Sequence, residues 1–496
     1  MKTNLRIFLL AMLVMTLATT TTHAWARPMN DDLGEKVDAY ITETMKRFPI
    51  PGMAVGIVKG DKVLYLKGYG TANADGDPVT PQTPFMLASV TKTFTALAVQ
   101  QLAQAGKIDL NAPVQTYIPD FRLNDEHNGA TVTVRHLLDH TSGISTIEGT
   151  QPSLHSSRAT FDSALKQLAR YRPDYEPGEL YEYSNWNYAL LGEVISRTSG
   201  QTYVEYMQDN ILNPLEMSRA SFADYHTLPG VATGNLIVFG IPVPYNEKVA
   251  PATRSAGYLS ASAEDMTHYL LTYYNHGQYN RHALLNSEGL GWYDAYWNWH
   301  TGMPDDISIG FSGGHNSINT NIQLFPFHRV GVVILMNTRL EQLIPGPSAN
   351  EIAFNLARMS IDYPYEVPSN RVFYGGYAAL DLLLVILIVS ILWQILRWKG
   401  WSIQYRNAQT KKRIILWLGI VLDILLSIGI FILPSVLKTR WNIILFFRPD
   451  FSVPLLLIGI CLGILGISKI IRSKYKLDNS ENSSGQHGKV FISPNL

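Results

Sequence analysis

The sequence predicts an α+β protein: an antiparallel β-sheet flanked by helices, with an inserted helical subdomain, followed by three transmembrane helices. Strand-like segments stand near the two ends of the first 365 residues, the earlier pair after an amphipathic helix expected over residues 31–47. Helical patterns and Pro-marked loops fill the middle, from Ser89 to about Leu215, and three long apolar runs follow. Strands and helices that are segregated along the chain favour an antiparallel sheet with a helical insertion.

The predicted sheet has two pairs of strands. Residues 53–58 and 63–69 are apolar runs with β-branched side chains, and the Lys-Gly-Asp-Lys tetrapeptide between them is a hairpin signal. Strand character returns at residues 318–325 and 330–336, which are linked through Pro326. The first and last parts of the domain are therefore expected to meet in one sheet.

Residues 1–26 have the features of a secretory signal peptide. Two basic residues precede an apolar run over residues 7–18, and alanines flank Trp25 at the two positions that a signal peptidase reads. An uncleaved anchor is the alternative, but the apolar run is short for one. We therefore expect cleavage near Ala26 and an extracytoplasmic domain over residues 27–365.

The apolar runs at residues 374–396, 414–437 and 453–471 are each near the length of about 20 residues that a helix needs to cross a bilayer. The loop over residues 397–413 holds six basic residues and no acidic one, which places it in the cytoplasm by the positive-inside rule. The basic tail over residues 472–496 is expected there too. These features predict a multi-pass protein of the cytoplasmic (inner) membrane, with its domain on the extracytoplasmic, periplasmic side.

Composition narrows the functional classes. The chain has 496 residues, 16% of them charged, and a formal net charge of zero, so no nucleic-acid partner is indicated. Cys461 is the single cysteine, which excludes an intrachain disulfide. Asp381 and Asp423 fall inside the predicted spans. For them we favour hydrogen bonds to neighbouring helices over proton or substrate translocation.

Ser89-Val90-Thr91-Lys92 is the most informative motif, because positions i and i+3 of a helix share a face. The Lys92 amine can then take the proton of Ser89 Oγ and make a nucleophile, and the start of a helix favours an oxyanion at the serine. Only this serine follows a turn region and a buried-looking Phe-Met-Leu and then opens a strong helical pattern. The same spacing occurs at Ser163/Lys166, Ser435/Lys438 and Ser473/Lys476.

A second proton carrier is expected at Tyr183-Ser184-Asn185, which precedes a helical segment. A phenol near an amine can ease proton transfer from the nucleophile and later to a leaving amine. A tyrosine that merely packs a helix start is the alternative. The spacing of His136 and His140 would permit a metal, but the carboxylate partners are lacking, so we expect a loop wall or a hydrogen-bonded turn there. No metal and no cofactor are expected.

The chain resembles the penicillin-binding protein and class C β-lactamase family of serine hydrolases in four segments taken in order: Ser89 to Lys92, His136 to Gly143, Tyr183 to Asn185 and Gly257 to Met266. The resemblance spans the whole exported region. It implies a β-lactamase-like fold with the active site between sheet and helical subdomain. It also implies Ser89 as nucleophile, Lys92 as general base, Tyr183 as proton shuttle, and acylation of the serine followed by hydrolysis.

The third motif of that family, a Lys or His followed by any residue and Gly, departs from the pattern here. One frame is Phe311-Ser312-Gly313, which lacks the basic residue; the other is His315-Asn316-Ser317, which lacks the glycine. We favour the first frame, in which the Ser89 and Gly314 N–H groups form the oxyanion hole. The expected substrate-binding residues are Met86, Asn185, Ser312, Gly313 and His315. Without a cation, a grip on a substrate carboxylate is less expected.

The whole architecture is similar to the membrane-anchored peptidases that mature colibactin, zwittermicin and related nonribosomal products. That resemblance implies antibiotic biosynthesis and prodrug activation, with removal of an acyl-D-asparagine leader from an exported peptide. The expected partners are a peptide or acyl-peptide substrate, the lipid bilayer and an export transporter. One alternative is a cell-wall D,D-carboxypeptidase or a β-lactamase-like hydrolase or esterase. An alternative of another class is a catalytically inactive membrane sensor or scaffold.

Overall fold

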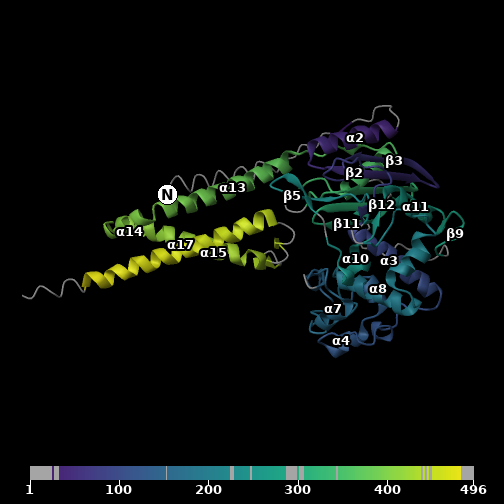
Figure 1. The fold of residues 1–496 in the computed structure, drawn as a ribbon, viewed down its shortest axis with the longest axis horizontal. Helices are drawn as coiled ribbons and strands as arrows, with labels where there is room; N and C mark the ends of the chain where they lie inside the picture. Colours follow the sequence, from purple (N-terminus) through teal and green to yellow (C-terminus); the bar gives the residue numbers. More distant parts are fainter. Residues whose placement is uncertain are drawn as a thin grey trace, which may run out of the picture. The chain divides into compact units, whose positions relative to one another are not determined.

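One antiparallel sheet joins distant parts of the chain in the computed structural model (Figure 1). Its strand order is β10-β11-β12-β13-β2-β3. The strands are β2 (Gly52–Lys59), β3 (Lys62–Gly70), β10 (Trp299–His300), β11 (Ile307–His315), β12 (Ile318–Phe325) and β13 (Val330–Met336). The structure describes residues 25–26, 33–151, 154–223, 228–245, 248–285, 299–300, 307–341, 344–436, 440–441, 444–445 and 449–481.

The sheet confirms the predicted fold class and its strand pairs. β2 and β3 form a hairpin around Gly60, whose φ of 62° suits a residue without a Cβ. β12 and β13 form the later hairpin, and Met336 lies opposite Met53 where β13 pairs with β2. The two ends of the domain therefore meet in the middle of one sheet, and β11 extends it on the other side of β12.

Helices cover both faces of this sheet. On one face α11 (Ala263–Tyr274) packs so closely that a Cβ at Gly56 would lie 2.7 Å from Thr267. On the other face lie α12 (Ala349–Met359) and α2 (Leu33–Arg47), which are joined by an Asn355 Nδ2 to Tyr40 hydroxyl hydrogen bond of 3.0 Å. The face toward α11 also receives the residues around Ser89, because η1 (Ala88–Val90) packs on β11 and β12.

The predicted helical insertion follows the first hairpin (Figure 1). Its members are α3 (Thr91–Gln104), η2 (Val114–Thr116), α4 (Glu126–Thr131), α5 (Val134–Leu138), α6 (Thr146–Gly149), α7 (Phe161–Leu168), α8 (Asn185–Ser199), α9 (Tyr203–Met207) and η3 (Gln208–Leu212). Short elements connect it to the sheet: β4 (Phe85–Met86), which pairs with β7 (Ser260–Ala261), β5 (Gly234–Val238) with β6 (Ile241–Tyr245), β8 (Gln278–Tyr279) with β9 (His282–Ala283), η4 (Pro251–Thr253) and α10 (Arg254–Gly257). The insertion and the sheet share one hydrophobic core.

The described residues divide into two compact units: the globular unit, which ends at Gly375, and a C-terminal unit, which begins at Gly376. Its helices are α13 (Arg371–Leu396), α14 (Trp398–Arg406), α15 (Thr410–Val436) and α17 (Pro449–Glu481). Within the described residues, three segments are long and apolar enough to cross a membrane: Arg371–Leu396, Thr410–Val436 and Asp450–Ser473. These helices indicate membrane association.

Asp423 has the helix-to-helix hydrogen bonds expected of an acidic residue in such a segment. Its carboxylate accepts from Lys469 Nζ at 2.8 Å and from Gln394 Nε2 at 3.3 Å, so three helices meet at one ion pair. For Asp381 the interpretation stays a prediction: its Oδ1 has no hydrogen-bond partner among the residues that the structure describes.

The N-terminal boundary stays a prediction. Residues 1–24, which hold most of the expected signal peptide, lie outside the described residues. In the unprocessed chain β1 (Trp25–Ala26) pairs with β14 (Tyr365–Glu366), a two-residue contact that cleavage after Ala26 would remove.

Candidate active site

Ser89 lies in a tight turn between sheet and helix. The chain leaves β4, passes through η1 and enters α3 at Thr91, so Ser89 precedes the α-helix instead of opening it. Ala88 has φ of 47°, a left-handed conformation that costs a non-glycine residue of order 1 kcal/mol or more. The buried side chains of Leu87 and Val90 on either side keep the turn in this conformation. The Ser89 side chain then projects beyond the start of α3.

Lys92, in the first turn of α3, is fully buried and surrounded by oxygen atoms. Its Nζ lies 3.2 Å from Ser89 Oγ, 2.9 Å from Asn185 Oδ1 and 2.6 Å from the Ala256 carbonyl oxygen. The two carbonyl oxygens can only accept hydrogen bonds. In the neutral amine they take both N–H protons, and the lone pair is left facing the Ser89 hydroxyl.

Burial favours that neutral amine. The loss of water around Nζ lowers the pKa of Lys92 well below its ordinary value of 10.5. The rings of Tyr183 and Tyr188 have centroids 4.9 and 5.7 Å from Nζ. The sequence-predicted pair of hydroxyl and amine is therefore brought together in a form suited to proton abstraction.

Tyr183 completes the group from the helical subdomain. Its hydroxyl donates to Ser89 Oγ at 2.8 Å, and burial raises the pKa of the phenol, so the proton stays on the tyrosine at neutral pH. Tyr183 and Asn185 stand at the start of α8, whose first turn thus meets both Ser89 and Lys92. Lys92 and Tyr183, which the sequence singles out together with Ser89, therefore both contact Ser89 Oγ.

His140 holds the Tyr183 segment in place. Its Nδ1 accepts from the Ser184 N–H at 3.1 Å and from Asn187 Nδ2 at 3.0 Å, and its carbonyl accepts from the Glu182 N–H at 2.8 Å. Its ring lies on that of Tyr183, with centroids 4.5 Å apart. Burial, with a smaller effect of Lys92, lowers the pKa of His140 well below 6.5, in keeping with a neutral ring whose Nδ1 is an acceptor.

β11 passes directly over the serine turn. A Cβ at Gly313 would lie 2.1 Å from the Leu87 carbonyl oxygen, so only glycine allows this approach. The same oxygen accepts from Thr320 Oγ1 at 2.7 Å. The favoured Phe311-Ser312-Gly313 frame therefore places its glycine against the nucleophile turn, while Phe311 is packed in the hydrophobic core.

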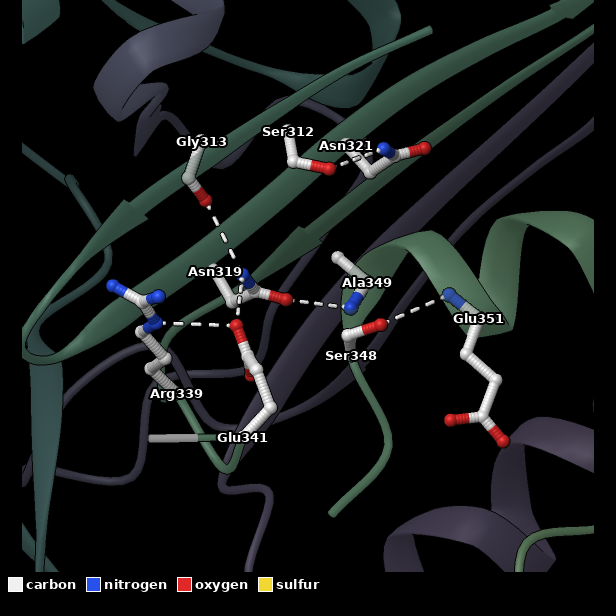
Figure 2. A network of polar contacts seen from close by, with 9 residues as sticks. All are labelled: Ser312, Gly313, Asn319, Asn321, Arg339, Glu341, Ser348, Ala349 and Glu351. Carbon is white, nitrogen blue, oxygen red and sulfur yellow. Dashed lines mark hydrogen bonds and ion pairs between the residues drawn. The ribbon is translucent and has the colours of Figure 1, made fainter. Parts of the chain in front are cut away.

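The opposite face of β11 is fixed by a polar network (Figure 2). Asn319 Nδ2 donates to the Gly313 carbonyl at 3.3 Å and to Glu341 Oε1 at 2.9 Å, and Arg339 Nε donates to the same carboxylate oxygen at 3.1 Å. Ser312 Oγ accepts from Asn321 Nδ2 at 2.9 Å on this face, which α12 covers. The Ser312 side chain thus points away from Ser89, and only its backbone can contact a substrate there.

Gly314 and His315 finish β11 beside the serine. A two-residue turn closes on a bonded pair, here His315 and Ile318, and bonding direction alternates along an antiparallel strand. The Gly314 N–H is therefore directed to the edge of β11 away from β12, as an oxyanion donor requires. His315 Nε2 lies 3.5 Å from the Cβ position of Gly257, and burial together with nearby positive groups lowers the pKa of His315 to about 3.

The remaining predicted residues have structural partners. Met86 is buried in a small apolar cluster with Tyr258 and Ile318. Asn185 gives Oδ1 to Lys92 and donates Nδ2 to the Gly149 carbonyl at 3.2 Å, so it orients the amine. Ser163, which has the same spacing to Lys166 as Ser89 has to Lys92, belongs to the capping box of α7, and its Oγ accepts from the N–H of the N-cap residue Thr160 at 3.1 Å. Substrate contacts by Met86, Asn185, Ser312, Gly313 and His315 stay predictions.

Sequence reasoning missed three groups around Lys92. These are the Ala256 carbonyl, the role of His140 in holding the Tyr183 segment, and His155, whose buried Nε2 lies 2.9 Å from the Gly149 carbonyl oxygen. A backbone carbonyl carries no signal in the sequence. For His140, the signal is its place in a segment for which the sequence predicts a loop wall or a hydrogen-bonded turn.

A buried lysine between a serine and a tyrosine, set where a helical insertion meets an antiparallel sheet, defines a class of serine hydrolases. Residues 37–344 match the family model described as Beta-lactamase, and the chain belongs to this family. The family resemblance seen in the motifs is thereby confirmed, and membership supports a hydrolase.

Similar proteins extend this result. The protein flp of Staphylococcus aureus (strain COL) is 27% identical over 440 residues, which cover 85% of this chain and 87% of flp. The putative penicillin-binding protein PbpX of Bacillus subtilis (strain 168) is 32% identical over 206 residues, 41% of this chain and 48% of PbpX. Both similarities agree with the family model.

Solved structures share the fold. The octameric penicillin-binding protein homologue from Pyrococcus abyssi matches with a TM-score of 0.56 and 26% identity, over 66% of this chain and 77% of that one. A class C beta-lactamase matches with a TM-score of 0.56 and 20% identity, over 67% and 98% of the two chains. The D-alanine carboxypeptidase AmpC from Burkholderia cenocepacia gives 0.54 and 22%, over 66% and 99%. The last two likenesses concern the fold alone.

Proposed function

We propose that the chain is a membrane-anchored, extracytoplasmic serine peptidase or amidase that acts through an acyl-enzyme. The observation that carries the proposal is the arrangement at Lys92 Nζ, which lies 2.9 and 2.6 Å from two carbonyl oxygens and 3.2 Å from Ser89 Oγ. If the neutral amine gives its two protons to those carbonyl oxygens, its lone pair faces Ser89. The apolar C-terminal helices support the anchor.

In the first half of the reaction, Ser89 Oγ bonds to the substrate carbonyl carbon while its proton passes to Lys92 Nζ. The carbonyl oxygen becomes an oxyanion, which accepts from the Ser89 and Gly314 N–H groups. The carbon–nitrogen bond then breaks as the leaving nitrogen receives the proton through the Tyr183 hydroxyl. In the second half, a water molecule loses a proton to the same amine and attacks the ester, and Ser89 leaves with a proton.

For the substrate we propose an exported nonribosomal peptide prodrug, from which the enzyme removes an acyl-D-asparagine leader. The third motif supports a substrate without a free carboxylate at this place. Phe311 is apolar, and burial keeps His315 neutral with a pKa of about 3, so neither residue offers a positive charge. A carboxylate bound by these two residues would lose water without gaining a positive charge from either of them.

A fluorophosphonate probe and mass spectrometry test the proposal. We expect the probe to label Ser89 in membranes that hold the full chain, and acyl-D-asparaginyl peptides to be cleaved after the asparagine. Ser89→Ala should abolish both signals. Ser163→Ala is the control, because it removes a serine with the same spacing to a lysine in the capping box of α7. This variant should keep both probe labelling and peptide cleavage. Near-normal turnover by Ser89→Ala would reject the mechanism, and an unlabelled Ser89 would favour a sensor or scaffold.

A D,D-carboxypeptidase or β-lactamase-like activity is the second candidate, favoured by the similarity to a putative penicillin-binding protein. Penicillin decides between the two. Stable acylation of Ser89 by penicillin, with no cleavage of acyl-D-asparaginyl peptides, would support the second candidate and overturn the first.

A further inference from the structure

The orientation of the Asn185 amide decides whether Lys92 can act as a base. Its Oδ1 lies 2.9 Å from Lys92 Nζ and can only accept, so the lone pair of a neutral amine stays available to Ser89. If the two ends of the amide exchanged places, Nδ2 would donate to that lone pair and Ser89 would lose its base. The two ends have nearly the same size, so a neighbour must select the orientation.

The backbone carbonyl of Gly149 is such a neighbour. Its oxygen, which can only accept, lies 3.2 Å from Asn185 Nδ2. An exchanged amide would set two oxygen atoms against each other there, so the carbonyl selects the orientation that serves Lys92. Glycine permits the close approach, because a Cβ at Gly149 would lie 2.6 Å from the Asn185 backbone nitrogen. The end of α6 therefore touches the start of α8 directly.

The rest of α6 is bound to the segment that precedes Asn185. Ser184 Oγ donates to the Ser145 carbonyl at 3.1 Å. Thr146 Oγ1 donates to the Tyr183 carbonyl at 2.6 Å, and the Thr146 N–H donates to a Glu182 carboxylate oxygen at 2.9 Å. These bonds place α6 beside the catalytic tyrosine segment, but none of them reaches the carbonyl oxygen at the end of α6.

His155 supplies a second donor to the Gly149 carbonyl oxygen. Its Nε2 lies 2.9 Å from that oxygen and must carry a proton, since a carbonyl cannot donate. Asn185 Nδ2 lies 3.5 Å from the same ring nitrogen, so an imidazole N–H and an amide N–H converge on one acceptor. Burial lowers the pKa of His155, in keeping with a neutral ring that holds its proton on Nε2.

We propose that His155 is a positioning residue for the Ser89 nucleophile. It acts through two groups, the Gly149 carbonyl and the Asn185 amide, and keeps the lone pair of Lys92 directed at Ser89 Oγ. Each of the four contacts from the imidazole to the nucleophile is 3.2 Å or shorter. The inference rests on the proposed function, because it assigns His155 to the acylation of Ser89.

The rate at which a fluorophosphonate labels Ser89 in the full-length protein tests this role without the natural substrate. His155→Leu keeps an apolar side chain at the position but removes the donor, whereas His155→Gln keeps an N–H that can reach the carbonyl. We expect labelling to slow about tenfold in His155→Leu, which is the order of one hydrogen bond. In His155→Gln it should return to within about threefold of the wild type.

Two further variants separate positioning from folding. In an Asn185→Leu background, His155→Leu should slow labelling by less than about twofold more, because the amide that it serves is absent. His268→Leu is the matched control, since His268 on α11 donates Nδ1 to the Leu215 carbonyl at 3.0 Å. This variant loses the same kind of bond and should keep the wild-type labelling rate, whatever its melting temperature.

Three results would overturn the inference while leaving the proposed function intact: a wild-type rate in His155→Leu, an equal loss in His155→Leu and His155→Gln, or the same loss with and without the Asn185 amide. An equal slowing in His268→Leu would also overturn it, because the loss would then follow from stability. A wild-type protein in which the probe does not label Ser89 would overturn the proposed function and this inference together.

Discussion

Asn185→Asp tests whether Lys92 acts as a neutral base. The substitution keeps the shape of the side chain but puts a carboxylate where the amide oxygen lies 2.9 Å from Lys92 Nζ. A neighbouring negative charge stabilises the ammonium form, which has no lone pair for the Ser89 proton. The variant should therefore be inactive at neutral pH and regain activity as the pH rises.

The distance sets the size of the effect. Coulomb's law at 2.9 Å with an effective dielectric constant of about 20 gives about 6 kcal/mol, which equals about four pKa units. Loss of water around the new carboxylate reduces this figure, so we expect the acidic limb of the pH profile to move up by at least about two units. At a pH below the new pKa, kcat/KM falls about tenfold per unit.

The assay measures hydrolysis of a chromogenic ester by the full chain between pH 5 and pH 11, in steps of about 0.5 pH units. Asn185→Leu is the control, because it removes the same acceptor without adding charge and should not raise the acidic limb. If Asn185→Asp kept the wild-type limb while its fold was intact, Lys92 would not be the base.

Three further substitutions test the site and its support. Tyr183→Phe should lower kcat about 100-fold or more with little change in KM, and a wild-type kcat would contradict the shuttle. Gly313→Ala should lower the melting temperature and the rate of probe labelling, because its Cβ would lie 2.1 Å from the Leu87 oxygen; Gly375→Ala, which meets open space, should change neither. Buried His140 stays neutral while the unfolded chain takes up a proton below pH 6.5. The melting temperature should therefore fall as the pH is lowered below 6.5, and it should fall less steeply in His140→Asn. Identical slopes of melting temperature against pH in the two proteins would refute this cause.

The sheet was predictable because its strands are continuous apolar runs with clear breaks. β12 and β13 coincide with the predicted segments, and the Gly60 turn is where the hairpin signal put it. The order of the strands was not predictable from these local patterns. The pairing of β13 with β2 joins residues about 280 positions apart, which only tertiary packing decides.

The candidate site was partly predictable for the same reason. Ser89 and Lys92 are only three residues apart, so the short turn that leads from η1 into α3 is enough to bring them together. Tyr183 needed the family resemblance, since its contact with Ser89 spans 94 positions. The Ala256 carbonyl could not be found, because any residue type presents the same oxygen.

The rate at which a fluorophosphonate labels Ser89, followed against pH in the wild type and in Lys92→Ala, tests the central claim most directly. A neutral Lys92 with a lowered pKa predicts a rate that rises through an inflection well below pH 10.5 and a slow rate without that inflection in the variant. The same inflection and a similar rate in Lys92→Ala would contradict it.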